Sequence, residues 1–305
     1  MFVESLLNDR TDSRIVCQIF VDGVYTREVS ADLRIGELAR RTGVSPELLR
    51  AWERRYGLLR PERSSGGYRL YSAEDERRVG TMTGALGRGI SAAEAARLAL
   101  GEAVDLPSAG TLVEALVAFD DVGAHAALDR LLSSLTLESV LRDSVLPALR
   151  DLGDRWQRGE VTVGQEHFAS NLLRGRLLGL ARGWDRGSGP RALLACPAGE
   201  QHDLSLIVFG LALREHGWRI TYLGADTPLA TIDETATTLR PDLVVVAAVD
   251  SARLSGQADA LHDLGTRFQL ALAGAGAKKA LVAEIGATHL DEDPIAAAAT
   301  VASGR

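Results

Sequence analysis

The feature that most constrains the fold is a series of five apolar runs in the last part of the chain, at residues 191–196, 219–223, 242–249, 270–273 and 287–290. The segments between the runs have the length and spacing of helices. Apolar strands that alternate with helices form a parallel sheet, because right-handed crossovers cover both faces of the sheet with helices. The pattern predicts an α/β doubly wound, five-stranded parallel sheet of flavodoxin-like type, with strand order 2-1-3-4-5.

The loop after the first predicted strand reads CPAGEQHDLS at residues 196–205, and Asp250 and Ser251 follow the third strand. In this topology ligands sit at the carboxyl ends of the strands, at the switch point between the first and third. His202 is therefore expected where a ligand binds, and a neutral imidazole there can ligate a metal. A structural role for a single loop histidine stays open on this pattern alone.

Two other functions of such a fold are disfavoured. A receiver domain needs an acidic pair after the first strand to hold Mg²⁺, and Cys196 and Pro197 supply none. A nucleotide fold places its glycine-rich turn after the first strand, whereas the turn from Gly274 to Gly276 follows the fourth. This turn would instead let the backbone approach something flat or bulky.

An alanine- and leucine-rich stretch precedes the sheet. Apolar residues at three- and four-residue spacing predict helices at residues 111–118, 121–134, 137–157 and 161–182. Short loops would join these helices into a four-helix bundle and bring Trp156, Glu166 and His167 to one end of it. Spacing alone favours a core position for Trp156 and a solvated face for Glu166 and His167, and leaves contact with a large ligand as the alternative.

Charge is distributed unevenly along the chain. The net charge is −7, yet arginines outnumber acidic residues between positions 34 and 97. A basic segment on an acidic chain indicates a module that binds a polyanion.

The basic segment shows the pattern of a winged helix. Ile35, Leu38 and Ala39 share one face of a short helix, and a turn at residues 42–44 leads to a second helix with Ser45 as its N-cap. A structural helical hairpin would show the same pattern. Residues 60–71 then form a glycine-turned hairpin rich in arginine and tyrosine, which is typical of a wing beside a recognition helix.

Residues 34–100 resemble the winged helix of the MerR family, through WERRYGLL at 52–59 and GYRLY at 67–71. The resemblance implies binding to double-stranded operator DNA. It places the following residues in the major groove or on the adjacent backbone: Arg50, Arg54, Arg55, Tyr56, Arg63, Tyr68 and Arg69. Trp52 is expected in the small core.

The long dimerisation helix of that family is interrupted here by Gly101, Pro107 and Gly110. An antiparallel coiled coil is therefore not expected, and any assembly must come from the later domains. No cysteine lies near this segment, which disfavours sensing of a metal ion.

From residue 111 onward the chain resembles a helical cap followed by a cobalamin-binding domain. That family's pattern is Asp or Glu, any residue, His, two residues, Gly, and Glu200 and His202 match it while Ser205 replaces the glycine. The resemblance implies that His202 ligates cobalt and that Glu200 or Asp203 fixes its tautomer. The other implied cofactor contacts are Gln201, Leu204, Ser205, Ala247, Val249, Gly274 and Gly276.

The combination of winged helix, Trp-x9-Glu-His cap and cobalamin domain is similar to CarH-type light-sensing repressors, which use adenosylcobalamin. The resemblance implies that Trp156, Glu166 and His167 surround the adenosyl group. It also implies a tetramer that holds the operator in the dark and is released by light through cobalt-carbon cleavage. Gln157 stands where some members carry a cobalt-capturing histidine, so a bis-histidine light state is not expected.

These interpretations divide the chain into an arm at residues 1–31, expected to be poorly ordered, a DNA-binding domain at 32–105, a four-helix cap at 108–184 and a Rossmann-like cobalamin domain at 189–305. No run predicts a membrane span or a secretory start, which indicates a cytoplasmic protein. Without a substrate barrel, a cobalamin enzyme is disfavoured. The main alternative is a repressor of this architecture whose last domain needs no cobalamin and answers to a protein partner or another ligand.

Overall fold

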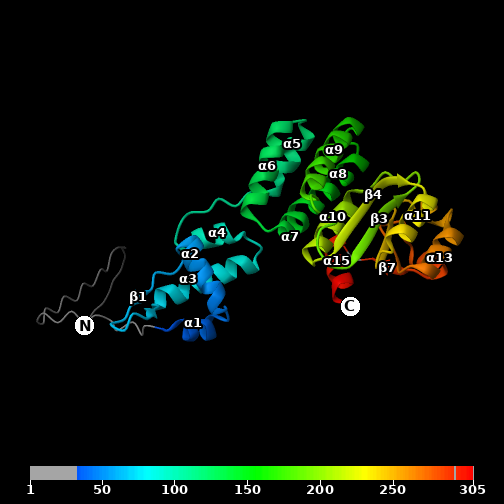
Figure 1. The fold of residues 1–305 in the computed structure, drawn as a ribbon. Coiled ribbons are helices and arrows are strands. Elements are labelled where there is room, and N and C mark those ends of the chain that lie inside the picture. Colours follow the sequence, from blue (N-terminus) through cyan, green and yellow to red (C-terminus); the bar gives the residue numbers. More distant parts are fainter. Residues whose placement is uncertain (1–32, 292, 305) are drawn as a thin grey trace, which may run out of the picture.

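The computed structural model describes residues 33–291 and 293–304, so the arm expected at residues 1–31 lies outside it. Figure 1 shows a small helical unit, a helical bundle and an α/β unit following one another along the chain. Among the described residues, no helix is both long and apolar enough to cross a membrane.

The first unit is a winged helix. Its elements are α1 (Ile35–Thr42), α2 (Pro46–Tyr56), β1 (Glu62–Arg63), β2 (Arg69–Leu70), α3 (Ala73–Gly87) and α4 (Ala92–Ala99). Ser45 caps α2 by accepting a hydrogen bond from the Leu48 amide, and Gly57 ends the helix in the left-handed conformation. Trp52 is buried in the core of this unit, as predicted.

The bundle contains α5 (Ala109–Val117), α6 (Asp121–Ser134), α7 (Leu137–Val140), the π-helical turn η1 (Leu141–Val145), α8 (Leu146–Gln157) and α9 (Val163–Leu180). The single helix expected at residues 137–157 is therefore interrupted by a π turn. Pro147 explains the interruption, because it has no amide hydrogen for the carbonyl of Asp143 and its ring crowds the preceding turn.

The α/β unit is the predicted doubly wound sheet. Its strands are β3 (Arg191–Pro197), β4 (Arg219–Thr227), β5 (Leu243–Ala247), β6 (Leu270–Ala273) and β7 (Thr288–Leu290). All neighbours pair in parallel in the order β4-β3-β5-β6-β7, which confirms the order 2-1-3-4-5. The helices are α10 (Leu204–Glu215), α11 (Leu229–Leu239), α12 (Ser251–Ser255), α13 (Ala258–Arg267), α14 (Lys279–Ile285) and α15 (Pro294–Ser303).

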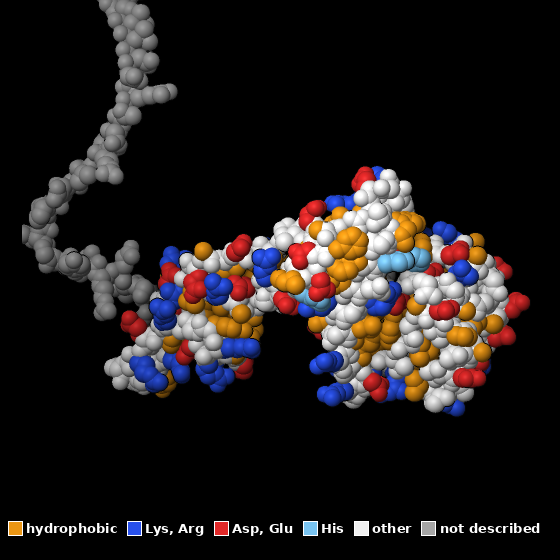
Figure 2. Space-filling view, turned by 90° about the horizontal axis from the view of Figure 1, so that it is seen from above, with side chains coloured by type: hydrophobic (Ala, Val, Ile, Leu, Met, Phe, Trp, Pro, Cys, Tyr) orange, Lys and Arg blue, Asp and Glu red, His pale blue; other side chains and the backbone are white. Residues whose placement is uncertain are grey.

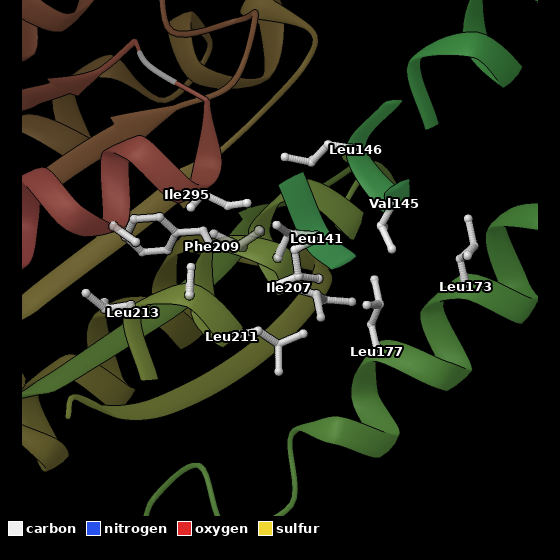
Figure 3. Close-up of a cluster of buried hydrophobic side chains, with 14 of the residues drawn as sticks. Leu141, Val145, Leu146, Leu173, Leu177, Ile207, Phe209, Leu211, Leu213 and Ile295 are labelled. Carbon is white, nitrogen blue, oxygen red and sulfur yellow. The ribbon is translucent and has the colours of Figure 1, made fainter. Parts of the chain in front are cut away.

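The bundle and one face of the sheet share a continuous core. Figure 3 shows Leu173 and Leu177 of α9 facing the same apolar cluster as Ile207 and Leu211 of α10. A second cluster, formed by α11 to α14, covers the other face of the sheet. Burial of apolar surface stabilises such a contact by roughly 25 cal/mol per Å². The shared core therefore holds α9 against α10, the helix that follows the His202 loop.

A short bridge joins the winged helix to the bundle. Ile90 pairs with Leu135, the Ser91 amide donates to the Ser134 carbonyl at 2.9 Å, and the Thr136 amide donates to the Gly89 carbonyl at 2.8 Å. Leu135 packs against the cores of both units. The two units are therefore joined by a defined contact as well as by the linker before α5.

Gly89 is expected to be the least tolerant position of this bridge. It has a φ of +76°, and a Cβ built on it would lie 1.7 Å from Oγ of Ser139. Gly101 is a matched control, because its φ is +83° but nothing lies within 4 Å of its Cβ position. We expect Gly89→Ala to lower the free energy of unfolding by about 1–3 kcal/mol more than Gly101→Ala, measured in urea. Equal losses of unfolding free energy in the two variants would contradict the close contact between Gly89 and Ser139.

Candidate functional site

A cavity of about 1150 Å³ lies between the bundle and the carboxyl ends of the strands. Its walls come from α8 and α9 above, from the loop after β3 and the start of α10 below, and from the ends of β5 and β6. Figure 2 shows histidine side chains beside the hollow between these parts. The volume exceeds the roughly 300–1,000 Å³ of ordinary small-molecule pockets, so the site suits a large ligand.

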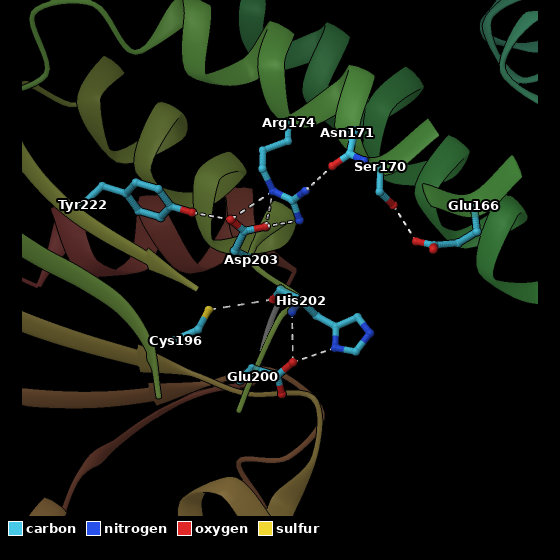
Figure 4. A network of polar contacts seen from close by, with 9 residues as sticks. All are labelled: Glu166, Ser170, Asn171, Arg174, Cys196, Glu200, His202, Asp203 and Tyr222. Carbon is cyan, nitrogen blue, oxygen red and sulfur yellow. Dashed lines mark hydrogen bonds and ion pairs between the residues drawn. The ribbon is translucent and has the colours of Figure 1, made fainter. Parts of the chain in front are cut away.

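The lower wall presents the imidazole of His202. The His202 side chain is 72% exposed, whereas that of Glu200 is 2% exposed. Nδ1 of His202 donates to Oε1 of Glu200 at 2.6 Å, and the His202 amide donates to the same oxygen at 2.9 Å (Figure 4). This contact fixes the tautomer and leaves Nε2 as the nitrogen that can coordinate a metal.

Glu200 is itself fixed by the end of β5. Its Oε2 accepts hydrogen bonds from the amides of Val249 at 2.8 Å and Asp250 at 3.2 Å. Burial raises the pKa of Glu200, but the hydrogen bonds from His202, Val249 and Asp250 outweigh it, so the pKa lies below its usual value. Glu200 is therefore a charged acceptor that orients His202 from behind the cavity wall.

Asp203 does not contact the His202 ring but pairs with Arg174 and Tyr222. Its carboxylate accepts from Nε of Arg174 at 2.9 Å and from the hydroxyl of Tyr222 at 2.6 Å (Figure 4). The hydrogen bond to Asp203 raises the pKa of Arg174, while burial and the same carboxylate raise the pKa of Tyr222. Of the two candidates for fixing the His202 tautomer, Glu200 is the one in contact with the ring.

The upper wall brings together the three residues of the bundle end. Trp156, at the end of α8, is 49% exposed and lines the cavity with Glu166 and His167 of α9. The core position that spacing favoured for Trp156 is wrong, because α8 ends with this side chain over the cavity. Glu166 accepts from Nδ1 of His167 and from the hydroxyl of Ser170, each at 2.6 Å. Burial raises the pKa of Glu166, yet these hydrogen bonds hold it below its usual value.

Most of the remaining predicted cofactor contacts line the cavity. Gln201, Leu204, Ser205, Ala247, Val249 and Gly274 line the cavity. Gly276 is not part of the cavity wall. A Cβ on Gly276 would lie 2.8 Å from the Asp250 carbonyl carbon, and one on Gly274 would lie 2.5 Å from the Ala248 oxygen. Both glycines allow a close contact between the loops after β5 and β6, and Gly274 also lines the cavity, where the sequence suggested close approach to a ligand.

Several wall residues were missed by sequence reasoning. Ser170 and Arg174 follow Glu166 at four-residue steps on α9, so helical periodicity could have found them. Asn171 lies on the same face. Pro294 and Ala297 of α15 also line the cavity, and nothing in their local sequence indicates it.

The candidate DNA-contacting residues lie on α2 and the wing. Arg50, Arg54, Arg55, Arg63, Tyr68 and Arg69 are exposed, and Tyr56 is half-buried. Glu53 of α2 was missed: it accepts from Nε of Arg69 and from the hydroxyl of Tyr71, each at 3.0 Å. Burial and this hydrogen bond raise the pKa of Tyr71 to about 12. Glu53 thus fixes the wing against the second helix.

Known families match the three parts of the chain. The family described as MerR HTH family regulatory protein matches residues 33–102, and two families described as B12 binding domain match residues 109–178 and 190–294. The transcriptional repressor CarA of Myxococcus xanthus is 36% identical over 274 residues, which are 85% of this chain and 93% of CarA. The chain belongs to the CarA/CarH family.

CarH of the same organism is 33% identical over 257 residues, which are 78% of this chain and 85% of CarH. Membership in the CarA/CarH family confirms the predicted combination of a MerR-type helix-turn-helix with B12-binding domains, and a regulator rather than an enzyme. The monomethylamine corrinoid protein of Methanosarcina barkeri has the same fold over 64% of this chain and 96% of its own, with a TM-score of 0.54 at 19% identity.

Proposed function

We propose that the chain is a transcriptional repressor that binds operator DNA through its winged helix and adenosylcobalamin in the cavity between bundle and sheet. The observation that carries the proposal is the His202 imidazole, held by Glu200 with Nε2 available, in a cavity whose opposite wall carries Trp156. Similarity to CarA and CarH, both described as repressors, supports the regulatory role. As a regulator of bacterial DNA it would act in the cytoplasm.

The donor set fits a cobalt corrin. The described residues include no group of three His, Cys, Asp or Glu side chains placed to hold a metal ion. A single imidazole suits a metal whose in-plane ligands come from its own macrocycle. The cavity walls combine apolar side chains, such as Leu149, Leu152 and Trp156, with polar ones, such as Asn171 and Gln201, as an amphipathic ligand of that size requires.

Each part of the site then has a role. His202 would hold the cobalt through Nε2, and Glu200 accepts the hydrogen bond from Nδ1 so that Nε2 carries no proton. Trp156, Glu166 and His167 form the surface that the upper ligand contacts. When bound, adenosylcobalamin supplies a cobalt-carbon bond that visible light cleaves. Gln157 lines the cavity beside Trp156, and its amide is a poor cobalt ligand, so no second histidine takes part from that position.

The signal reaches DNA through assembly. In the dark the loaded chain forms a tetramer that presents several winged helices to one operator, and tethered sites can gain about 10²- to 10⁴-fold in avidity. After illumination Trp156 loses its packing partner, α8 shifts, and the tetramer dissociates. Each separate winged helix then binds the operator weakly, which ends repression.

A gel shift with an operator fragment tests this function, with adenosylcobalamin kept dark or illuminated and particle size measured on the same samples. The proposal expects a large complex that retains DNA in the dark and loses it in light. Dark retention without cobalamin, or the absence of a corrin spectrum on the protein, would instead support a repressor that responds to a protein partner or another ligand.

A further inference from the structure

A buried ion pair connects the bundle to the loop that carries His202. Nε of Arg174 lies 2.9 Å from Oδ1 of Asp203, and Nη2 of Arg174 lies 2.8 Å from the same oxygen. The Asp203 side chain is 4% exposed and also accepts from the Tyr222 hydroxyl at 2.6 Å. Three elements that are distant in sequence, α9, the loop before α10 and β4, therefore meet at one carboxylate (Figure 4).

The two ends of this pair sit beside the two walls of the cavity. Asp203 directly follows His202, and Arg174 lies two helical turns after Glu166 on the same face of α9. Asn171, one turn before Arg174, accepts from its guanidinium at 3.1 Å. Two guanidinium nitrogens, Nε and Nη2, contact the Asp203 carboxylate. Because the guanidinium is planar and rigid, these contacts relate the tilt of α9 to the position of the histidine loop.

The His202 loop thus has two anchors of different origin. Glu200 accepts a hydrogen bond from the end of β5, within the α/β unit, and Asp203 pairs with Arg174 of the bundle. Only the second anchor depends on how the bundle is seated. Arg174 also differs from its neighbour Arg176, which pairs with Asp129 inside the bundle and does not line the cavity.

We propose that Arg174 is a positioning residue for the cofactor, acting through Asp203 to hold the His202 loop in register with the upper wall of the cavity. The inference rests on the proposed binding of cobalamin and adds a residue pair to it. It couples the seating of the bundle to the position of His202, because moving α9 away would leave the buried Asp203 carboxylate without its cationic partner.

The test uses the full chain and adenosylcobalamin in the dark, with Arg174→Met, Asp203→Leu, the double variant carrying both changes, and Arg176→Met as the matched control. Affinity and the absorbance bands that report axial coordination are measured together with the unfolding temperature of the cofactor-free protein. We expect each single variant to bind about 10- to 100-fold more weakly, as loss of supporting contacts at metal sites does, with a smaller histidine-coordinated fraction.

The double variant separates positioning from stability. Replacing both partners by apolar side chains removes the uncompensated buried charge, so the unfolding temperature should recover relative to the single variants. Affinity should stay low and fall no further than in the worse single variant, because both changes break one link. Arg174→Lys, which keeps the positive charge on a single nitrogen, should bind more tightly than Arg174→Met but less tightly than wild type.

Three outcomes would contradict these proposals. If the double variant recovers both stability and wild-type affinity and spectrum, or if Arg176→Met weakens binding as much as Arg174→Met, the positioning role is wrong. If the single variants do not fold, the double variant carries the test, and wild-type affinity and spectrum in it would overturn the role. A wild-type chain that binds no cobalamin would refute the proposed function itself.

Discussion

His202→Ala is expected to lower the affinity for adenosylcobalamin by at least about 100-fold, and operator retention in the dark should fall with it. The change removes the only nitrogen that the loop after β3 offers to cobalt and leaves Glu200 without its ring donor. Loss of a supporting hydrogen bond alone costs about 10- to 100-fold at metal sites. Equilibrium titration in the dark, followed by absorbance, measures the loss.

Two further variants calibrate that result. Glu200→Gln keeps the shape of the side chain but weakens its hydrogen bonds to His202, Val249 and Asp250, so it should fall between wild type and His202→Ala. His216→Ala removes an exposed histidine at the far end of α10 and should bind as wild type does. Wild-type affinity in His202→Ala would mean that the imidazole is not a required ligand.

Replacing Arg54 and Arg55 together by alanine is expected to weaken operator binding by about 10²- to 10⁴-fold, at about 1–3 kcal/mol for each lost contact. Both side chains are exposed in the last turn of α2. If they contact phosphates, the slope of log affinity against log salt should decrease by about two. Fluorescence anisotropy at several salt concentrations measures both quantities.

Arg77→Ala provides the matched control for DNA binding. Arg77 is exposed on α3 of the same unit and pairs with Glu74, so its loss removes one positive charge, as each of the changes at Arg54 and Arg55 does, without touching α2 or the wing. Operator affinity close to that of wild type is expected. If Arg77→Ala weakened binding as much as a change at Arg54 or Arg55, general charge rather than α2 would account for affinity.

Local periodicity determines much of this fold. The five apolar runs predicted the five strands of the parallel sheet, because a strand buried on both faces is apolar along its length, and the doubly wound topology predicted their order. Ends were less predictable: β4 continues to Thr227, whereas β5 stops at Ala247. The π turn depends on how Pro147 is accommodated in the middle of a helix, which residue spacing does not show.

The site was predictable where it follows a motif. Glu200 and His202 are two residues apart, so their contact is local. The pairing of Arg174 with Asp203 joins residues 29 positions apart, and only the seating of the bundle on the sheet brings them together. Spacing alone misplaced Trp156, because an apolar side chain over a ligand cavity has the same sequence pattern as one in a core; only the resemblance put it beside a cofactor.

Electron paramagnetic resonance of the chain loaded with reduced, divalent cobalamin tests directly whether His202 ligates cobalt. The measurement compares protein made with ordinary histidine and with ¹⁵N-labelled histidine. A ¹⁴N ligand splits each cobalt line into three and a ¹⁵N ligand into two. We therefore expect doublets in the labelled protein and triplets in the unlabelled one, with loss of the doublets in His202→Ala. Triplets that persist in the labelled protein would show that the ligand nitrogen comes from the cofactor's own tail and would contradict the role of His202.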